Sequence, residues 1–91
     1  MTVVKRLRIH GHVQGIGYRY SMLAQAVATG VKGWVRNRRD GTVEAMVAGT
    51  PEAVQQITEW ARHGPRGALV TDVRIESGEG SFDSFEQLPT A

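Results

Sequence analysis

The 91-residue sequence contains no cysteine, and no aspartate or glutamate precedes Asp40. The lack of cysteine excludes disulfides, thiolate metal sites and a cysteine nucleophile. No apolar run approaches the ~20 residues that a membrane-spanning helix needs. The N-terminus alternates charged with apolar residues and has no signal-peptide core. We therefore expect a cytoplasmic protein without a membrane partner.

Positive charge is concentrated early in the chain. All but three of the 11 Lys and Arg residues precede Asp40, all nine acidic residues lie from Asp40 onward, and the net charge is +2. Such asymmetry can steer anions toward one end of a molecule. Folding can also mix the two parts into an evenly charged surface, and charge alone favours that second interpretation.

The length and composition indicate one globular domain over residues 1–91, because the chain is long enough for one core and too short for two. Apolar and turn residues predict strands at Val3–His10, Val31–Arg36, Thr42–Ala48 and Leu69–Glu76, with a possible short edge strand at Phe85–Leu88. Helices are predicted from Tyr18 to a stop at Gly30, and from an N-cap at Thr50 to Gly64.

Two faces are expected to point toward the core. In the first helix this face comprises Tyr18, Met22, Leu23, Ala26 and Val27. In the last long strand it comprises Leu69, Thr71, Val73 and Ile75.

The predicted order β-α-β-β-α-β favours an α+β fold, the ferredoxin-like split βαββαβ sandwich, with an antiparallel sheet and two helices on one face. In this arrangement the third strand separates the first two, which run parallel. The glycine-rich loop after the first strand and Asn37 after the second then meet at one sheet edge, roughly 10 Å apart.

Residues 11–20 read GHVQGIGYRY, with three glycines before Arg19. Glycine permits positive φ, so successive N–H groups can converge on an anion at the start of a helix. Arginine adds a planar fork that matches phosphate oxygens. The nucleotide-binding patterns are absent, because Tyr20 stands where G-x-G-x-x-G needs its third glycine. Spacing alone leaves an anion cradle and an ordinary glycine-rich turn equally open.

The sequence resembles the acylphosphatase family at two separate motifs. Ile9–Arg19, IHGHVQGIGYR, resembles the family's phosphate-loop signature, and Gly33–Gly49, GWVRNRRDGTVEAMVAG, resembles its second signature. The resemblance covers nearly the whole chain. Ile16 replaces the usual valine and Tyr18 the usual phenylalanine, and the Tyr18 hydroxyl must reach water or a hydrogen-bond partner.

The resemblance implies hydrolysis of carboxyl-phosphate bonds in small acyl phosphates to a carboxylate and inorganic phosphate. A backbone nest, an arginine and an amide can supply this chemistry without metal or cofactor. A domain of this size can act alone, so a monomer is expected. The resemblance also implies that Arg19 binds the phosphoryl group and that Asn37 orients the attacking water. The implied phosphate-binding residues are His12, Val13, Gln14, Gly15, Ile16, Gly17, Tyr18 and Arg19.

Other candidates have simpler interpretations. His10 and His12 lack a third ligand nearby and are expected to be polar strand-end residues rather than metal ligands. Arg36, Arg38 and Arg39 are expected to lie in a solvated turn, although they could attract anionic substrates. RNA binding through the open sheet face is a weak rival, because Arg6, Arg8, Glu44 and Met46 provide no aromatic ladder there. A non-catalytic phosphate-binding module is a further alternative, which Asn37 argues against.

Overall fold

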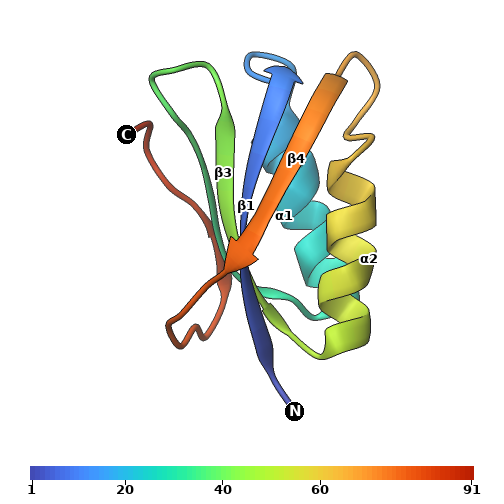
Figure 1. The fold of residues 1–91 in the computed structure, drawn as a ribbon, viewed down its shortest axis with the longest axis vertical. Coiled ribbons are helices and arrows are strands. Elements are labelled where there is room, and N and C mark those ends of the chain that lie inside the picture. The colour runs from blue at the N-terminus through green and yellow to red at the C-terminus, as the bar shows by residue number, and fades with distance from the viewer.

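The computed structural model describes residues 1–91, whose elements follow the predicted order (Figure 1). They are β1 (Val3–His12), α1 (Tyr18–Thr29), β2 (Lys32–Asn37), β3 (Val43–Gly49), α2 (Pro51–Ala61), β4 (Leu69–Ser77) and β5 (Phe85–Gln87). The βαββαβ arrangement and the short edge strand are therefore confirmed. β1 extends two residues beyond the predicted His10.

The sheet has the order β4-β1-β3-β2-β5, so β3 lies between β1 and β2 as expected. β1 pairs antiparallel with both β3 and β4, and β2 pairs antiparallel with β3. β5 instead pairs parallel with β2, placing Val35 opposite Gln87, which makes the sheet mixed at this edge. The chain leaves β4 at the end of the sheet where β2 begins, so it enters β5 in the direction of β2 (Figure 1).

Both helices cover the same face of the sheet (Figure 1). The core lies between them and the strands, and its central side chains include Leu7, Ile9, Met22, Val35, Val47 and Ile57. α2 begins as the sequence predicts, because the Thr50 hydroxyl accepts a hydrogen bond of 3.1 Å from the Ala53 N–H. No helix is long and apolar enough to span a membrane.

The buried stripe of α1 is narrower than expected. Tyr18, Met22 and Ala26 are buried, Leu23 is partly buried, and Val27 is 69% exposed. Spacings of four residues follow one line along a helix, whereas Val27 lies about 100° around the axis from Ala26. The prediction that Val27 faces the core is therefore wrong.

The expected core face of β4 is also only partly correct. Val73 is buried, but Leu69 is 66% and Ile75 is 43% exposed, and Thr71 is exposed as well. The register of β1 against β4 shifts between His10 and Gly11. Such an irregularity reverses the alternation beyond it, so Val70 packs against the core in place of its neighbours.

Candidate active site

The loop between β1 and α1 presents unpaired backbone donors. Gly15 and Gly17 have φ values of 77° and 79°, the left-handed conformation that the sequence interpretation required. None of the N–H groups from Gln14 to Tyr20 donates to a backbone carbonyl, and the first helical bond of α1 runs from Ser21 N to Gly17 O at 3.0 Å. These donors and the helix N-terminus favour an anion.

Arg19 and Asn37 line one small hollow beside this loop. The hollow has a volume of about 80 Å³, and its other lining residues are Val13, Gly15, Gly17, Tyr18, Tyr20 and Gln87. One water needs roughly 10–15 Å³ of such volume, so there is room for a phosphoryl group beside a water. Arg19 is half-buried and forms no ion pair with an acidic side chain.

Asn37 is the last residue of β2, and its backbone is held from the C-terminal side. The Ala91 N–H donates to the Asn37 carbonyl at 3.1 Å, and Leu88 N donates to Val35 O at 2.9 Å. The Asn37 side-chain oxygen Oδ1 is buried and accepts no hydrogen bond from the protein. A buried amide oxygen that accepts no hydrogen bond lowers the stability of the fold. At this position the oxygen can accept a hydrogen bond from a molecule in the hollow.

The residues implied to bind phosphate divide into two groups. Val13, Gly15, Gly17, Tyr18 and Arg19 line the hollow, whereas His12, Gln14 and Ile16 do not. His12 pairs with Leu69 at the end of β1. The Gln14 side chain instead reaches the β2–β3 turn, where its amide nitrogen Nε2 donates to Arg38 O at 2.7 Å and Thr42 O at 2.9 Å.

The ring of Tyr18 faces the core and not the hollow. Its hydroxyl donates to the Ala61 carbonyl at 2.7 Å, which is the partner that the sequence required, and its ring lies 5.3 Å from that of Trp60. Burial raises the pKa of the Tyr18 phenol, because the charged phenolate would be desolvated. Tyr18 therefore anchors α1 to α2, while its backbone contributes to the loop.

The open face of the sheet carries a buried acid that the sequence interpretation did not single out. Only 2% of the Glu44 side chain is exposed, and four arginines surround it. Its oxygens lie 3.3 Å from Arg6 Nε, 3.8 Å from Arg8 Nη2, 2.9 Å from Arg36 Nε and 3.4 Å from Arg38 Nη1. The expectation of a solvated turn is thus wrong for Arg36 and Arg38. Because side chains alternate along β2 and β3, those of Arg36, Arg38 and Glu44 lie on the opposite face of the sheet from that of Asn37.

Asp40 orders the turn that follows Asn37. Its Oδ1 accepts hydrogen bonds from the Thr42 hydroxyl at 2.6 Å and the Thr42 N–H at 3.0 Å. These hydrogen bonds, followed by the charges of Arg8 and Arg38, lower the pKa of the Asp40 carboxyl.

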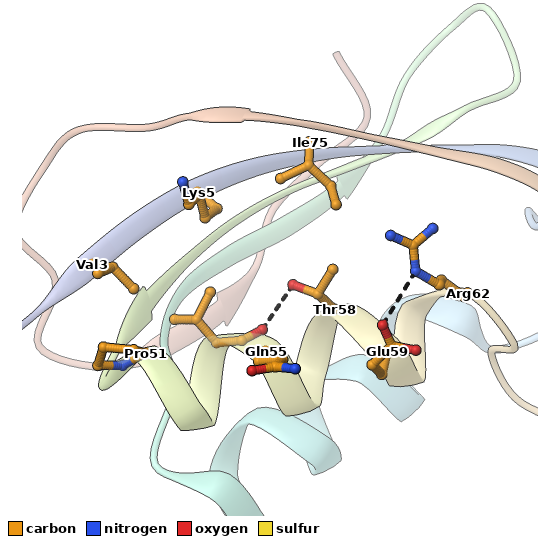
Figure 2. Close-up of a pocket in the computed structure, with 9 residues that line it drawn as sticks. Val3, Lys5, Pro51, Gln55, Thr58, Glu59, Arg62 and Ile75 are labelled. Carbon is orange, nitrogen blue, oxygen red and sulfur yellow. Dashed lines mark hydrogen bonds and ion pairs between the residues drawn. The ribbon is translucent and has the colours of Figure 1, made fainter.

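A second concavity lies elsewhere on the molecule. A groove of about 340 Å³ separates α2 from β1 and β4, with Lys5, Gln55 and Ile75 among its lining residues (Figure 2). Arg62 in this groove is already paired with Glu59 at 3.5 Å. The groove has no glycine-rich backbone, and its arginine is already paired, so the smaller hollow is the better candidate site.

Tyr20 and Gln87 also line the hollow, although the sequence interpretation named neither of them as a site residue. Tyr20 follows Arg19 in the first turn of α1, and Gln87 ends β5. Proximity to Arg19 could have suggested Tyr20. No local signal indicates Gln87, because its position depends on β5 crossing to the edge beside β2.

The fold and the hollow define a small split βαββαβ domain with a glycine-rich loop suited to an anion. The family model for acylphosphatases matches residues 5–87, and the chain belongs to the acylphosphatase family. It is 48% identical over 81 residues to an acylphosphatase of Cupriavidus pinatubonensis, covering 89% of this chain and 90% of that protein. It is 52% identical over 85 residues to an acylphosphatase of Pyrobaculum aerophilum, covering 90% of each.

Solved structures agree with this relationship. The acylphosphatase from Bacillus subtilis superimposes with a TM-score of 0.90 at 31% identity, covering 97% of this chain and 99% of that one. The acylphosphatase from Coxiella burnetii gives a TM-score of 0.92 at 28% identity, covering 96% and 93%. The family, the fold class and the activity class expected from the sequence, hydrolysis of acyl phosphates, are thereby confirmed.

Proposed function

We propose that this protein hydrolyses acyl phosphates in the hollow between the glycine-rich loop and the end of β2, with Arg19 and Asn37 as its catalytic residues. The observation that carries the proposal is their joint presence in one hollow beside unpaired backbone donors. In this proposal residues 1–91 act as a single domain, and every group required comes from one chain, which supports a monomeric enzyme.

Phosphoryl binding is the first task. The unpaired N–H groups of Gly15, Gly17 and Tyr18, together with the N–H and guanidinium of Arg19, would surround the phosphoryl oxygens with donors. Because the arginine forms no ion pair within the protein, its charge is available to the substrate. Donors fixed before the substrate arrives stabilise developing negative charge without reorganising, which is the main requirement of phosphoryl transfer.

Asn37 supports the attack of water. Its buried Oδ1 is free to accept a hydrogen bond from water in the hollow, which would orient that water toward phosphorus. An amide is too weak a base to remove the proton completely. In this proposal the proton passes to an oxygen of the substrate's own phosphate as the P–O bond to the acyl group breaks.

The leaving group needs little assistance. The departing carboxylate has a conjugate acid with a pKa of roughly 4, so it leaves without a general acid near neutral pH. The hollow contains no carboxylic acid and no imidazole. We therefore propose a reaction that uses main-chain donors, one guanidinium and one amide, without a metal or another cofactor.

We also propose that the enzyme is cytoplasmic and that its partners are acyl phosphates and inorganic phosphate. A chain without cysteine suits a reducing compartment. Nucleic acid is not proposed as a partner, because Arg6, Arg8, Arg36 and Arg38 already pair with Glu44 on the open sheet face.

The test follows benzoyl phosphate hydrolysis by ultraviolet absorbance, in the presence of a chelator, with Arg19→Gln assayed beside the parent. We expect rapid turnover in the parent. The variant should retain its circular dichroism spectrum while losing both turnover and inhibition by inorganic phosphate. A folded parent that binds phosphate but leaves benzoyl phosphate intact would instead be a non-catalytic binding module.

A further inference from the structure

Most residues of the hollow already have a function in the proposed reaction, and two do not. Tyr20 and Gln87 are neither part of the glycine loop nor the catalytic pair. Their side chains form no hydrogen bond within the protein. Tyr20 is 72% exposed, an unusual exposure for a large aromatic side chain.

The two residues reach the hollow from different elements. Tyr20 is the third residue of α1, and Gln87 is the last residue of β5. Gln87 pairs with Val35, two residues before Asn37, so alternation places Gln87 and Asn37 on the same face of the sheet. This is the face that α1 covers (Figure 1).

Exposure separates the inner from the outer part of the hollow. Val13 and Tyr18 are buried, and Arg19 and Asn37 are half-buried. The exposed lining residues are Gly15, Gly17, Tyr20 and Gln87, of which only the last two carry side chains. Tyr20 and Gln87 are therefore the side chains at the mouth.

An acyl phosphate has two halves, and the hollow has room for only one. A volume of about 80 Å³ suits a phosphoryl group and a water, so the acyl group must remain at the mouth. We propose that Tyr20 and Gln87 form the binding site for the acyl group, and that the site favours aromatic acyl groups over acetyl. This inference rests on the proposed hydrolysis.

The two side chains suit different parts of that group. The ring of Tyr20 has an apolar face on which an aromatic acyl group can pack. An acetyl group is too small to cover that face. The Gln87 amide can donate to the acyl carbonyl oxygen, which every acyl phosphate has. As the P–O bond breaks, its electron pair passes to the departing carboxylate, so a hydrogen bond to that carboxylate strengthens along the reaction.

The test compares benzoyl phosphate with acetyl phosphate and adds inorganic phosphate as an inhibitor without an acyl group. We expect Tyr20→Ala to raise the KM for benzoyl phosphate roughly three- to tenfold, with little change for acetyl phosphate and none in phosphate inhibition. Tyr20→Phe should retain the parent KM. Val27→Ala, which truncates another exposed α1 side chain, is the matched control.

Gln87→Ala should lower kcat for both substrates by roughly three- to thirtyfold, again without changing phosphate inhibition. Glu86→Ala is its control, because this neighbour in β5 is exposed and points to the other face of the sheet.

The outcomes distinguish the inference from the proposed function. If the parent hydrolyses both substrates and the Tyr20 and Gln87 variants match it, the acyl-binding site is refuted and the hydrolysis stands. Weakened phosphate inhibition in these variants would also refute it, since they would then be disturbing the phosphate loop. A parent that hydrolyses neither substrate would overturn the proposed function, and the inference with it.

Discussion

The side chain of Gln14 lies in the β2–β3 turn, with its amide nitrogen 2.7 Å from the carbonyl oxygen of Arg38. A second hydrogen bond of 2.9 Å reaches the carbonyl of Thr42. The glycine-rich loop is thus tied to the residue that follows Asn37, across 24 positions of sequence. The two hydrogen bonds of Gln14 couple the halves of the candidate site, because the loop carries Arg19 and the end of β2 carries Asn37.

Removal of this tie should reduce turnover. Gln14→Ala deletes two hydrogen bonds worth about 0.5–1.5 kcal/mol each, and we expect a fall in kcat of roughly tenfold with a smaller change in phosphate inhibition. Steady-state kinetics with benzoyl phosphate measure both. Gln14→Glu should be at least as damaging, because a carboxylate cannot donate to the two carbonyls. Unchanged kinetics in both variants would show that the tie has no catalytic effect.

Asn37→Ala should separate catalysis from binding. The variant loses the amide oxygen that orients water but retains Arg19 and the backbone donors, so phosphate should inhibit it as it inhibits the parent. Loss of one such polar group typically lowers the rate by roughly 10²–10³. Turnover and phosphate inhibition are measured on the same preparation. A variant with most of its activity would show that Asn37 does not orient the water.

Tyr18→Phe tests the anchor between α1 and α2. It removes the hydrogen bond to Ala61 and should lower the free energy of unfolding by about 0.5–1.5 kcal/mol near neutral pH, with little effect on kcat. Burial raises the pKa of Tyr18 above its ordinary 10.0, so the folded state retains the proton more strongly than the unfolded chain.

The stability that protonated Tyr18 contributes is fully present below the pKa that Tyr18 has in the unfolded chain. It is lost as the pH rises above that value. Thermal unfolding of parent and variant should therefore differ near neutral pH, and the difference should shrink in strongly alkaline solution. A difference that stays constant with pH would contradict this account.

Glu44→Gln should destabilise the fold. Removing one partner of a buried ion pair costs about 3–5 kcal/mol, but the arginines around Glu44 remain between 26% and 43% exposed and can be rehydrated. We therefore expect Glu44→Gln to lower the free energy of unfolding, measured in urea, by about 1–3 kcal/mol. Glu86→Gln, at an exposed position, is the control and should leave the urea midpoint unchanged.

Asp40→Asn should make the stability of the turn less sensitive to acid. The pKa of Asp40 lies below its ordinary 3.8, so its contribution is present above that value and is lost as the pH falls through the lowered pKa. The parent should unfold at a higher temperature than the variant near neutral pH, and the gap should close in strong acid. Asp83→Asn, in the exposed segment before β5, should show no such gap.

Local features of the sequence predicted much of the fold. The Thr50 cap and the Gly30 stop act over a few residues, and the structure confirms the helices that they delimit. Hydrophobic alternation located the strands, but it misplaced Leu69 and Thr71, because one register shift reverses the alternation of the side chains at the start of β4.

The candidate site divides in the same way. The sequence by itself determined the glycine-rich loop, its positive φ angles and the Arg19 that follows it, since glycine and a helix start need only their neighbours. Its order of elements also determined that Asn37 would end at the same edge of the sheet. Only the tertiary structure decided that Glu44 is buried among four arginines, that Gln14 reaches Arg38, and that Tyr20 and Gln87 line the hollow. These contacts join residues far apart in the chain, so they depend on strand register, on the direction of β5 and on the packing of α1, which no short stretch of sequence specifies.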